Sequence, residues 1–391
     1  MGDEPIPTTQ HLADEMIRHG VRRVHVLAWR DLDDPDAGGS EVHADEFMRR
    51  WAAAGLEITH RTSAAAGQPA TATRHGYKVV RRGSRYSVFP RAVASESVRR
   101  MGRYDALVEV WNGVPWMSPL WCHKPRITFL HHVHGPMWDQ LLPRPFAGVG
   151  RAMEARLAPP FYRRGLTLTP SEATRQDLLG LGFHADRVVA VNNGVDPMFT
   201  TGGRRNETPL VLCVGRLAPV KRQDELIEAA VVAKRRVPDM RLVIIGDGPL
   251  RPALEARVAA YGAADWISFA GRLSHAELVE HYQRAWLVSS ASLAEGWGLT
   301  LTEAAACGTP AVATDVSGHR SSVVDGVTGV LVPLDRLGQT IADVLLDGSR
   351  RTQLAEAALI RARTLTWDAS ARGILASLHG QVVARRRGSG D

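Results

Sequence analysis

The sequence has few cysteines. Only Cys122, Cys213 and Cys307 occur in 391 residues, and they lie far apart. An odd number at such distances fits neither a disulfide framework nor a zinc site. We therefore expect all three to be small buried side chains.

Long apolar runs are also missing. No uninterrupted stretch approaches the about 18 apolar residues that cross a bilayer. Residues 1–16, MGDEPIPTTQHLADEM, lack the basic and apolar regions of a signal peptide. The expected location is the cytoplasm, with a peripheral contact at the inner membrane surface as a further expectation.

Two motifs of nucleotide-dependent enzymes are absent. The G-x-G-x-x-G fingerprint fails in IGDGPLR because Arg251 stands where the third small residue belongs, which argues against a nicotinamide oxidoreductase. A D-x-D motif in a setting suited to a metal is missing as well, the nearest match being DLDD at residues 31–34. We expect no bound metal and no cofactor.

Length and composition indicate a globular protein of two domains. A chain of 391 residues exceeds one ordinary core, and 45% hydrophobic with 23% charged residues is typical of folded proteins. The net charge of +7 is uneven, since residues 61–126 carry twelve Lys or Arg and three acids. This excess predicts either a solvated basic face or a surface for an anionic substrate, phospholipid headgroups or nucleic acid.

Apolar β-rich segments alternate with helical patterns, which is typical of βαβ units and parallel sheets. In the first half the glycine turn DAGGSE leads into a helix that ends at Gly55. Strand-like segments there cover residues 21–29, 56–63, 104–111, 126–132, 165–171 and 188–194. This half predicts a doubly wound domain at residues 1–200.

The polar stretch TTGGRRNETP, residues 200–209, has the composition of a linker. After it, strand-like segments cover residues 210–215, 241–248, 264–271, 285–291 and 310–314. They predict a second domain at residues 201–367. A closing helix at 368–385 is expected to pack back on the first domain, and residues 386–391 form a flexible basic tail.

Two segments that follow predicted strands suit an anion. Backbone N–H groups at Gly38 and Gly39 would face it at a helix N-terminus, although GGS also fits an ordinary tight turn. Arg216 and Lys221 follow the first strand of the second domain. Two cations at the carboxyl end of a parallel strand suit a diphosphate, or are plain surface charge.

The stretch SLAEGWGLTLTEAAACGTP carries two acids, Glu295 and Glu303. Thr300 and Glu303 have the spacing of a capping box, so Glu303 is explained by a helix start alone. Glu295 is not, because it stands in a loop beside Trp297 and Gly298, where the backbone must approach something closely.

The order and spacing of several motifs identify a resemblance. GRLAPVKR, IGDGPLRPALE, SFAGRL and SLAEGWGLTLTEAAACGTPAVAT follow one another, after DAGGSEVHADEF, PSEATRQDLLGLG and VNNGVD. Together they resemble the family 4 retaining glycosyltransferases of the GT-B type. The resemblance implies two Rossmann-like, doubly wound parallel-sheet domains facing across a cleft, the first binding the acceptor and the second a nucleotide sugar.

The resemblance also implies roles for particular residues. Glu295 and Glu303 match the family's E-x7-E pair, the first facing the donor sugar and the second binding the ribose hydroxyls. Arg216 and Lys221 match the basic pair that grips the donor diphosphate. Further implied donor-binding positions are Gly38, Gly39, Gly215, Gly246, Gly248, Leu273, Trp297, Gly298, Leu299 and Thr300.

His131 matches the family's cleft histidine, which contacts the reacting sugar, with His132 and His134 as alternatives. A metal site is another interpretation of three such close histidines, but their spacing at a strand end points them in different directions. Gly135 and Pro136 stand where related sequences often have Arg and Glu. Candidate acceptor-binding residues are Ser40, His132, His134, Trp111, Asn112 and Trp138. The tryptophans fit the core equally well.

The implied reaction is a hexosyl transfer with retention, by departure and attack on one face, without a metal. The expected donor is a GDP- or UDP-linked sugar, and the acceptor is a small molecule, a lipid-linked molecule or a glycan. A sugar-nucleotide epimerase or phosphorylase of the same fold and a noncatalytic sugar-nucleotide-binding subunit are the alternatives. No nucleic-acid-binding module is recognisable. The protein is expected to be a monomer or homodimer.

Overall fold

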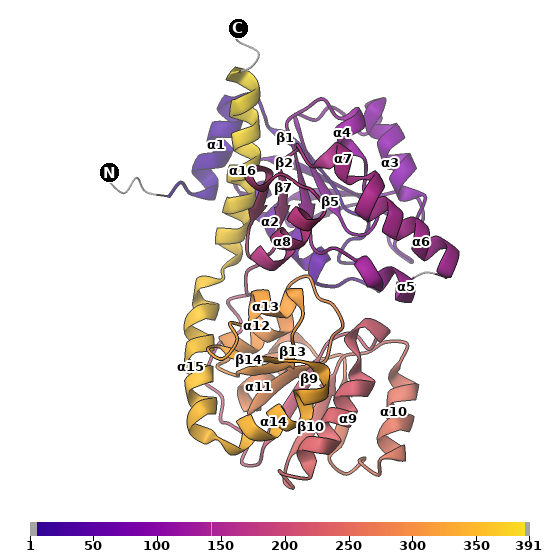
Figure 1. Cartoon of the computed structure of the whole chain (residues 1–391). Helices are drawn as coiled ribbons and strands as arrows, with labels where there is room; N and C mark the ends of the chain where they lie inside the picture. Colours follow the sequence, from indigo (N-terminus) through magenta and orange to yellow (C-terminus); the bar gives the residue numbers. More distant parts are fainter. Residues whose placement is uncertain (1–5, 142, 388–391) are drawn as a thin grey trace. The chain divides into compact units, whose positions relative to one another are not determined.

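The computed structural model describes residues 6–141 and 143–387, and the chain divides into two units (Figure 1). Unit 1 ends at Gly194 and resumes at Trp367, and unit 2 is Val195–Thr366. The sequence placed the first boundary after residue 200. The chain already belongs to unit 2 at Val195, because the N–H of Val195 donates to the carbonyl of Leu365 at 3.0 Å.

Unit 1 is built on an eight-stranded sheet of order β3-β4-β2-β1-β5-β6-β7-β8. The strands are β1 (Arg23–Leu27), β2 (Glu57–Thr62), β3 (Thr71–Arg74), β4 (Tyr77–Arg81), β5 (Ala106–Trp111), β6 (Arg126–Leu130), β7 (Thr167–Thr169) and β8 (Val188–Ala190). Neighbouring strands are parallel except β3 and β4, a hairpin that the sequence pattern did not predict. Its turn uses His75 and Gly76 at φ 44° and 84°, the left-handed backbone of tight hairpin turns.

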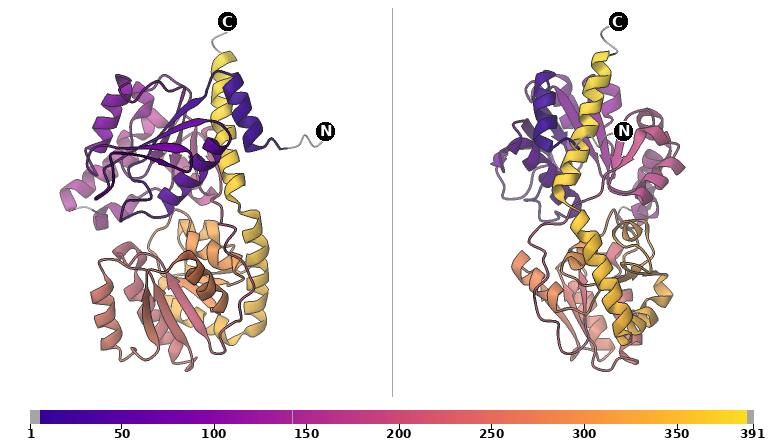
Figure 2. Two further views of the ribbon diagram at one scale, coloured as in Figure 1. Left: turned by 180° about the vertical axis from the view of Figure 1, so that it is seen from behind. Right: turned by 90° about the vertical axis from the view of Figure 1, so that its left-hand side faces the viewer.

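Helices cover this sheet. They are α1 (Thr9–Arg18), α2 (Gly39–Ala53), α3 (Val88–Ser97), α4 (Ser118–Trp121), α5 (Trp138–Leu141), α6 (Arg144–Ala152), α7 (Pro159–Tyr162), α8 (Glu172–Gly180) and α16 (Trp367–Arg387), with a π-helical turn at Met153–Leu157. Helix α16 contacts α1 and α2 (Figure 2). It continues to Arg387, two residues into the predicted tail, and residues 388–391 lie outside the described residues.

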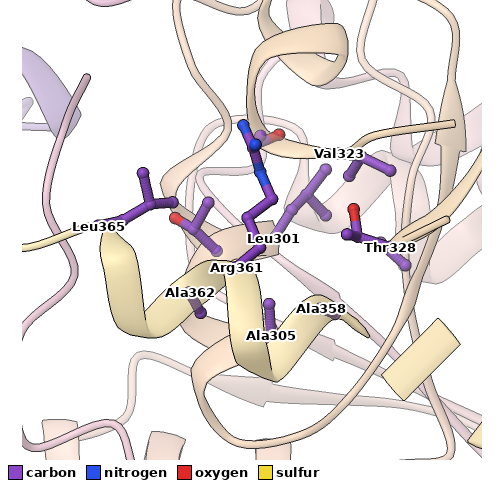
Figure 3. Close-up of a pocket in the computed structure, with 11 residues that line it drawn as sticks. Leu301, Ala305, Val323, Thr328, Ala358, Arg361, Ala362 and Leu365 are labelled. Atoms are coloured by element: carbon purple, nitrogen blue, oxygen red, sulfur yellow. The ribbon is translucent and has the colours of Figure 1, made fainter. Parts of the chain in front are cut away.

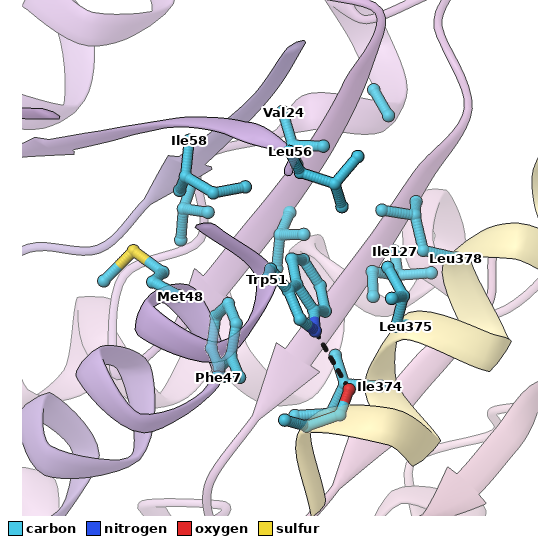
Figure 4. Packing of buried hydrophobic residues seen from close by; sticks show 14 of the residues in the cluster. Val24, Phe47, Met48, Trp51, Leu56, Ile58, Ile127, Ile374, Leu375 and Leu378 are labelled. Atoms are coloured by element: carbon cyan, nitrogen blue, oxygen red, sulfur yellow. Dashed lines mark hydrogen bonds between the residues drawn. The ribbon is translucent and has the colours of Figure 1, made fainter. Parts of the chain in front are cut away.

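The core of unit 1 explains why the closing helix packs there. Trp51 of α2 is fully buried, and its indole N–H donates to the carbonyl of Ala371 in α16 at 3.0 Å (Figure 4). Leu375 and Leu378 of α16 are buried in the same cluster. Burying a side chain of this size contributes about 1.5 to 3 kcal/mol.

Unit 2 has a parallel six-stranded sheet of order β11-β10-β9-β12-β13-β14. The strands are β9 (Leu210–Val214), β10 (Arg241–Ile245), β11 (Ile267–Gly271), β12 (Leu287–Ser290), β13 (Ala311–Thr314) and β14 (Gly329–Val332). The helices are α9 (Gln223–Lys234), α10 (Arg251–Ala260), α11 (His275–Arg284), α12 (Leu299–Ala306), α13 (Ser317–Ser322), α14 (Leu337–Leu346) and α15 (Gly348–Thr364). The strands β9, β10 and β11 extend from the middle of the sheet to one edge, and β12, β13 and β14 extend to the other, which is the Rossmann arrangement.

The prediction of two Rossmann-like α/β units is confirmed. The three cysteines are free and buried, as expected. Of the helices in the described part of the chain, none combines the length and the apolar character that crossing a membrane requires.

Candidate functional site

The strand order of unit 2 points to one edge of its sheet. Ligands of such sheets bind beyond the carboxyl ends of the strands where the order reverses, here β9 and β12. The loop after β9 carries Arg216 and Lys221, and the loop after β12 carries Glu295. A hydrogen bond connects the two loops, from the N–H of Leu293 to the carbonyl of Val220 at 2.8 Å. Lys221 and the first predicted acid are therefore brought together, and Arg216 lies in the same loop as Lys221.

Lys221 and Glu295 form an ion pair through Lys221 Nζ and Glu295 Oε1. Ser292 Oγ donates to the same oxygen at 2.8 Å. Burial alone would raise the pKa of Glu295, but the charge of Lys221 and these hydrogen bonds outweigh it and lower that pKa. The side chains keep 28% (Lys221) and 15% (Glu295) of their surface exposed, so a charged pair at this edge is open to a ligand. Arg216, one loop position past Gly215, is exposed.

Two predicted glycines, Gly246 and Gly248, are explained by close backbone packing. A Cβ on Gly246 would lie 2.0 Å from the carbonyl oxygen of Gly215, and one on Gly248 would lie 2.4 Å from that of Leu217. Both residues have φ in the left-handed half of the map, at 132° and 159°. Only glycine lets the loop after β10 lie against the loop that carries Arg216. Direct contact of these glycines with a donor stays a prediction.

The capping-box interpretation of Thr300 and Glu303 is wrong. Helix α12 begins after Gly298, which has φ 90°, so Thr300 is already the second residue of the helix. Glu303 instead accepts a hydrogen bond from the Tyr282 hydroxyl of α11 at 3.0 Å. Burial raises the pKa of Glu303 to about 7, although the Tyr282 hydrogen bond opposes the shift. Its carboxyl group is thus free for a role other than capping.

The apolar residues predicted around these acids lie mostly in the core. Trp297 is 4% exposed, and Leu273 and Leu299 pack on the same cluster. A ligand contact from this segment would therefore come from its backbone.

His319 was missed by the sequence analysis. It lies in α13, fully buried, with Nδ1 bonded to the carbonyl of Thr314 at 2.7 Å. Burial lowers the pKa of His319, although the nearby Glu295 acts in the opposite direction. The preceding Gly318 is required, since a Cβ there would lie 2.3 Å from the carbonyl oxygen of Glu295. The start of α13 therefore supports the Glu295 loop directly. Its only sequence signal was a Gly-His pair shortly after a predicted strand.

A small pocket lies next to the end of α13 and is lined mainly by residues of α12 and α15 (Figure 3). Arg361 projects into it and donates to the carbonyl of Ser321 at the end of α13, at 2.7 Å. None of the predicted site residues lines the pocket. We assign it to the packing of α13 rather than to the site.

In unit 1 the corresponding edge follows β1 and β5. Asn112, just after β5, donates through Nδ2 to Ser40 Oγ at 3.2 Å, which brings these two candidates together. The N–H of Gly38 already donates to Glu41 Oε2 at 2.8 Å. An anion at this helix start would therefore have to use other N–H groups than that of Gly38.

Of the three histidines after β6, His131 turns toward α2, whereas His132 and His134 lie against each other, so the prediction that all three point in different directions holds only for His131. His131 Nε2 lies 3.3 Å from His43 Nδ1 of α2, and burial lowers the pKa of both rings, that of His43 to about 3. The rings of His132 and His134 lie 4.3 Å apart. His131 is 5% exposed, and its side chain faces His43 in this structure. Its contact with a reacting sugar stays a prediction.

Glu154 organises the rest of this loop and was also missed. It accepts hydrogen bonds from the backbone N–H groups of His134 (2.8 Å) and Gly135 (2.9 Å) and from the Trp138 indole (3.1 Å). Trp138 stacks on His134 with ring centroids 4.9 Å apart. The carboxylate comes from the π-helical turn at Met153–Leu157, whose position the sequence pattern did not reveal.

Trp111 is not an acceptor platform. It is 1% exposed, its ring packs against Tyr162 at 4.7 Å, and its indole N–H donates to the carbonyl of Gly113 at 2.9 Å. The core interpretation that the sequence left open is the correct one for this residue.

The aspartates of DLDD and part of the basic excess neutralise each other. Arg81 Nε donates to Asp31 at 3.0 Å, and Arg81 and Arg74 both pair with Asp33. Arg61 is buried as well. The remaining excess lies on the surface and includes Arg91, Arg99 and Arg100, which are exposed in and just after α3.

Comparisons with known proteins agree with the geometry. The description "Glycosyl transferases group 1" matches residues 197–361, and "Glycosyltransferase Family 4" matches residues 37–199. The chain is 30% identical to a D-inositol 3-phosphate glycosyltransferase of Kribbella flavida, over 91% of this chain and 95% of that protein.

It is also 30% identical to a GDP-mannose-dependent alpha-(1-6)-phosphatidylinositol monomannoside mannosyltransferase of Mycolicibacterium smegmatis, over 73% of this chain and 79% of that protein. Among solved structures, sucrose-phosphate synthase of Thermosynechococcus elongatus is similar with a TM-score of 0.75 and 20% identity, covering 93% of this chain and 100% of that one. HepE of Anabaena in complex with UDP-glucose has a TM-score of 0.70 and 18% identity, covering 90% and 98%.

Proposed function

The chain belongs to the family 4, group 1 glycosyltransferases, and from this premise we propose that it transfers a sugar with retention from a nucleotide-diphosphate sugar, without a metal ion, to an acceptor that carries a phosphate. The observation that carries the proposal is the Lys221–Glu295 ion pair at the reversal point of the unit 2 sheet.

The donor is proposed to bind to unit 2. Lys221 and Arg216 neutralise its diphosphate, Glu295 accepts from hydroxyl groups of the sugar, and Glu303 accepts from the ribose hydroxyls. The diphosphate must share Lys221 with Glu295, since the two side chains are paired in the free protein. The names of similar proteins include both UDP-glucose and GDP-mannose, which supports a UDP- or GDP-linked donor.

Charge determines the order of events in the proposed reaction. As the bond between the anomeric carbon and the β-phosphate oxygen breaks, negative charge grows on the diphosphate, where Lys221 and Arg216 stabilise it. The acceptor hydroxyl bonds to the anomeric carbon from the same face, and its proton passes to the departing phosphate oxygen. The products are a nucleoside diphosphate and a glycoside of unchanged anomeric configuration. Glu295 orients the sugar, and the hydrogen bonds that Lys221 and Ser292 donate to its Oε1 hold the carboxylate in place.

The proposed acceptor class rests on relatives and on charge. The names of both relatives include an acceptor with a phosphate group, D-inositol 3-phosphate in one and phosphatidylinositol monomannoside in the other. The exposed arginines around α3 of unit 1 favour such an anion, and also a peripheral contact with an anionic membrane.

The test is a turnover assay with UDP- and GDP-sugars and inositol phosphates, followed by mass spectrometry and by proton NMR of the anomeric centre. We expect acceptor-dependent release of nucleoside diphosphate, retention, and equal rates with and without a chelator. Inversion, dependence on a divalent metal, or an epimerised sugar without transfer would each contradict the proposal. An Arg235→Met variant, which removes an exposed cation of unit 2, is the matched control for Lys221→Met.

A further inference from the structure

Helices α1 and α16 of unit 1 lie side by side and carry none of the candidate site residues (Figure 1). Glu15 and His19 are four residues apart in the chain, which puts them on one side of α1 and its C-cap. His379 comes from α16. One ligand atom from each of these three side chains lies within 4.8 Å of the others.

The distances suit a small cation. Glu15 Oε2 lies 3.4 Å from His379 Nε2, and the rings of His19 and His379 are stacked with centroids 5.9 Å apart. Ligand bonds of about 2.1 Å in a tetrahedron hold donor atoms about 3.4 Å apart. Two imidazoles, one carboxylate and a water are a common ligand set for zinc. His379 Nε2 is buried and makes no hydrogen bond within the described part of the chain.

The neighbouring charged side chains leave Glu15, His19 and His379 available to bind a metal ion. Arg18 pairs with Glu15 through Oε1 at 2.7 Å, whereas Oε2 faces His379. Arg386 donates to the backbone carbonyl of His19 at 2.6 Å.

We propose that Glu15, His19 and His379 bind one divalent transition-metal ion, with Zn²⁺ as the best match, and that this ion ties α1 to α16. The site is separate from the proposed transfer reaction, which uses no metal. Because the ligands come from two helices that are far apart in sequence, the bound ion stabilises their packing and raises the melting temperature of the protein.

The experiment uses the full chain without an affinity tag, freed of metal by a chelator and then dialysed. Calorimetry with ZnCl₂ is expected to give one site per chain, and Co²⁺ is expected to give visible absorption bands of a nitrogen- and oxygen-ligated ion. His19→Ala, His379→Ala and Glu15→Gln should each weaken binding by more than the about 10- to 100-fold that loss of an outer-shell partner costs. His123→Ala, which removes an exposed histidine elsewhere in unit 1, should bind as the wild type does.

Arg18→Gln should affect Zn²⁺ affinity in the opposite direction to the ligand variants. It removes the cation that competes for Glu15, so Zn²⁺ should bind at least as tightly as to the wild type. Absence of Zn²⁺ and Co²⁺ binding to the wild type would overturn the proposal. Binding that His19→Ala and His379→Ala leave unchanged, while circular dichroism shows both variants folded, would overturn it as well.

Discussion

Replacing Lys221 by Met removes one charge of the Lys221–Glu295 pair and keeps most of the side-chain length. A charge-assisted hydrogen bond contributes about 1.5 to 3 kcal/mol, which corresponds to a roughly 10- to 150-fold change in affinity. The effect should fall at the lower end, because Lys221 is 28% exposed and shares its charge with Glu295 in the free protein. We therefore expect UDP or GDP to bind about tenfold more weakly.

Glu295→Gln is the informative partner variant. It releases Lys221 from its ion pair, so the nucleoside diphosphate should bind as tightly as before or more tightly. Transfer should nevertheless fall about 100-fold or more, because the sugar loses the group that orients it. Calorimetry with UDP and GDP measures the first effect, and the turnover assay measures the second. If Glu295→Gln weakened diphosphate binding as much as Lys221→Met, the assignment of the two side chains to different parts of the donor would be refuted.

The other predictions concern the surroundings of this pair. Nucleotide binding should weaken about tenfold between pH 8 and pH 6, because ribose hydroxyls donate to the ionised form of Glu303, whose pKa is about 7. Calorimetry at both pH values measures this change in affinity. The Glu303→Gln variant should not show this pH dependence. Gly318→Ala should lower the free energy of unfolding by about 1 to 3 kcal/mol in urea titrations, because its Cβ meets the Glu295 carbonyl at 2.3 Å. His319→Leu should remove the hydrogen bond from Nδ1 to the Thr314 carbonyl, which still accepts from the Val316 N–H at 3.0 Å. We expect a cost of about 0.5 to 1.5 kcal/mol of stability and a turnover that falls more than diphosphate affinity does. An unchanged turnover number in a folded His319→Leu variant would argue against its support of the Glu295 loop.

The sequence predicted most of what is local in this protein. Strand segments such as 210–215 and 285–291 are apolar and bounded by turn residues, so their positions and the Rossmann pattern followed from short-range signals. The order of motifs then assigned Arg216, Lys221 and Glu295 to strand ends. The structure places these strand ends next to each other at the point where the strand order reverses.

What the sequence could not predict depends on partners that are distant in the chain. The sequence left open whether Trp111 lies in the core or faces an acceptor, and the answer depends on Tyr162, 51 residues later, which covers its ring. His319 and Glu154 matter through contacts across loops, which no spacing pattern reports. The capping box failed because Gly298 adopts a left-handed backbone and starts α12 two residues before Thr300 can cap it.

The most direct test is a crystal structure of the chain soaked with UDP-glucose or GDP-mannose. Our account predicts that the diphosphate lies within hydrogen-bonding distance of Lys221 Nζ and the Arg216 guanidinium, with the ribose hydroxyls on Glu303 and the sugar on Glu295. A nucleotide bound elsewhere on unit 2, with the Lys221–Glu295 pair unchanged and untouched, would contradict it.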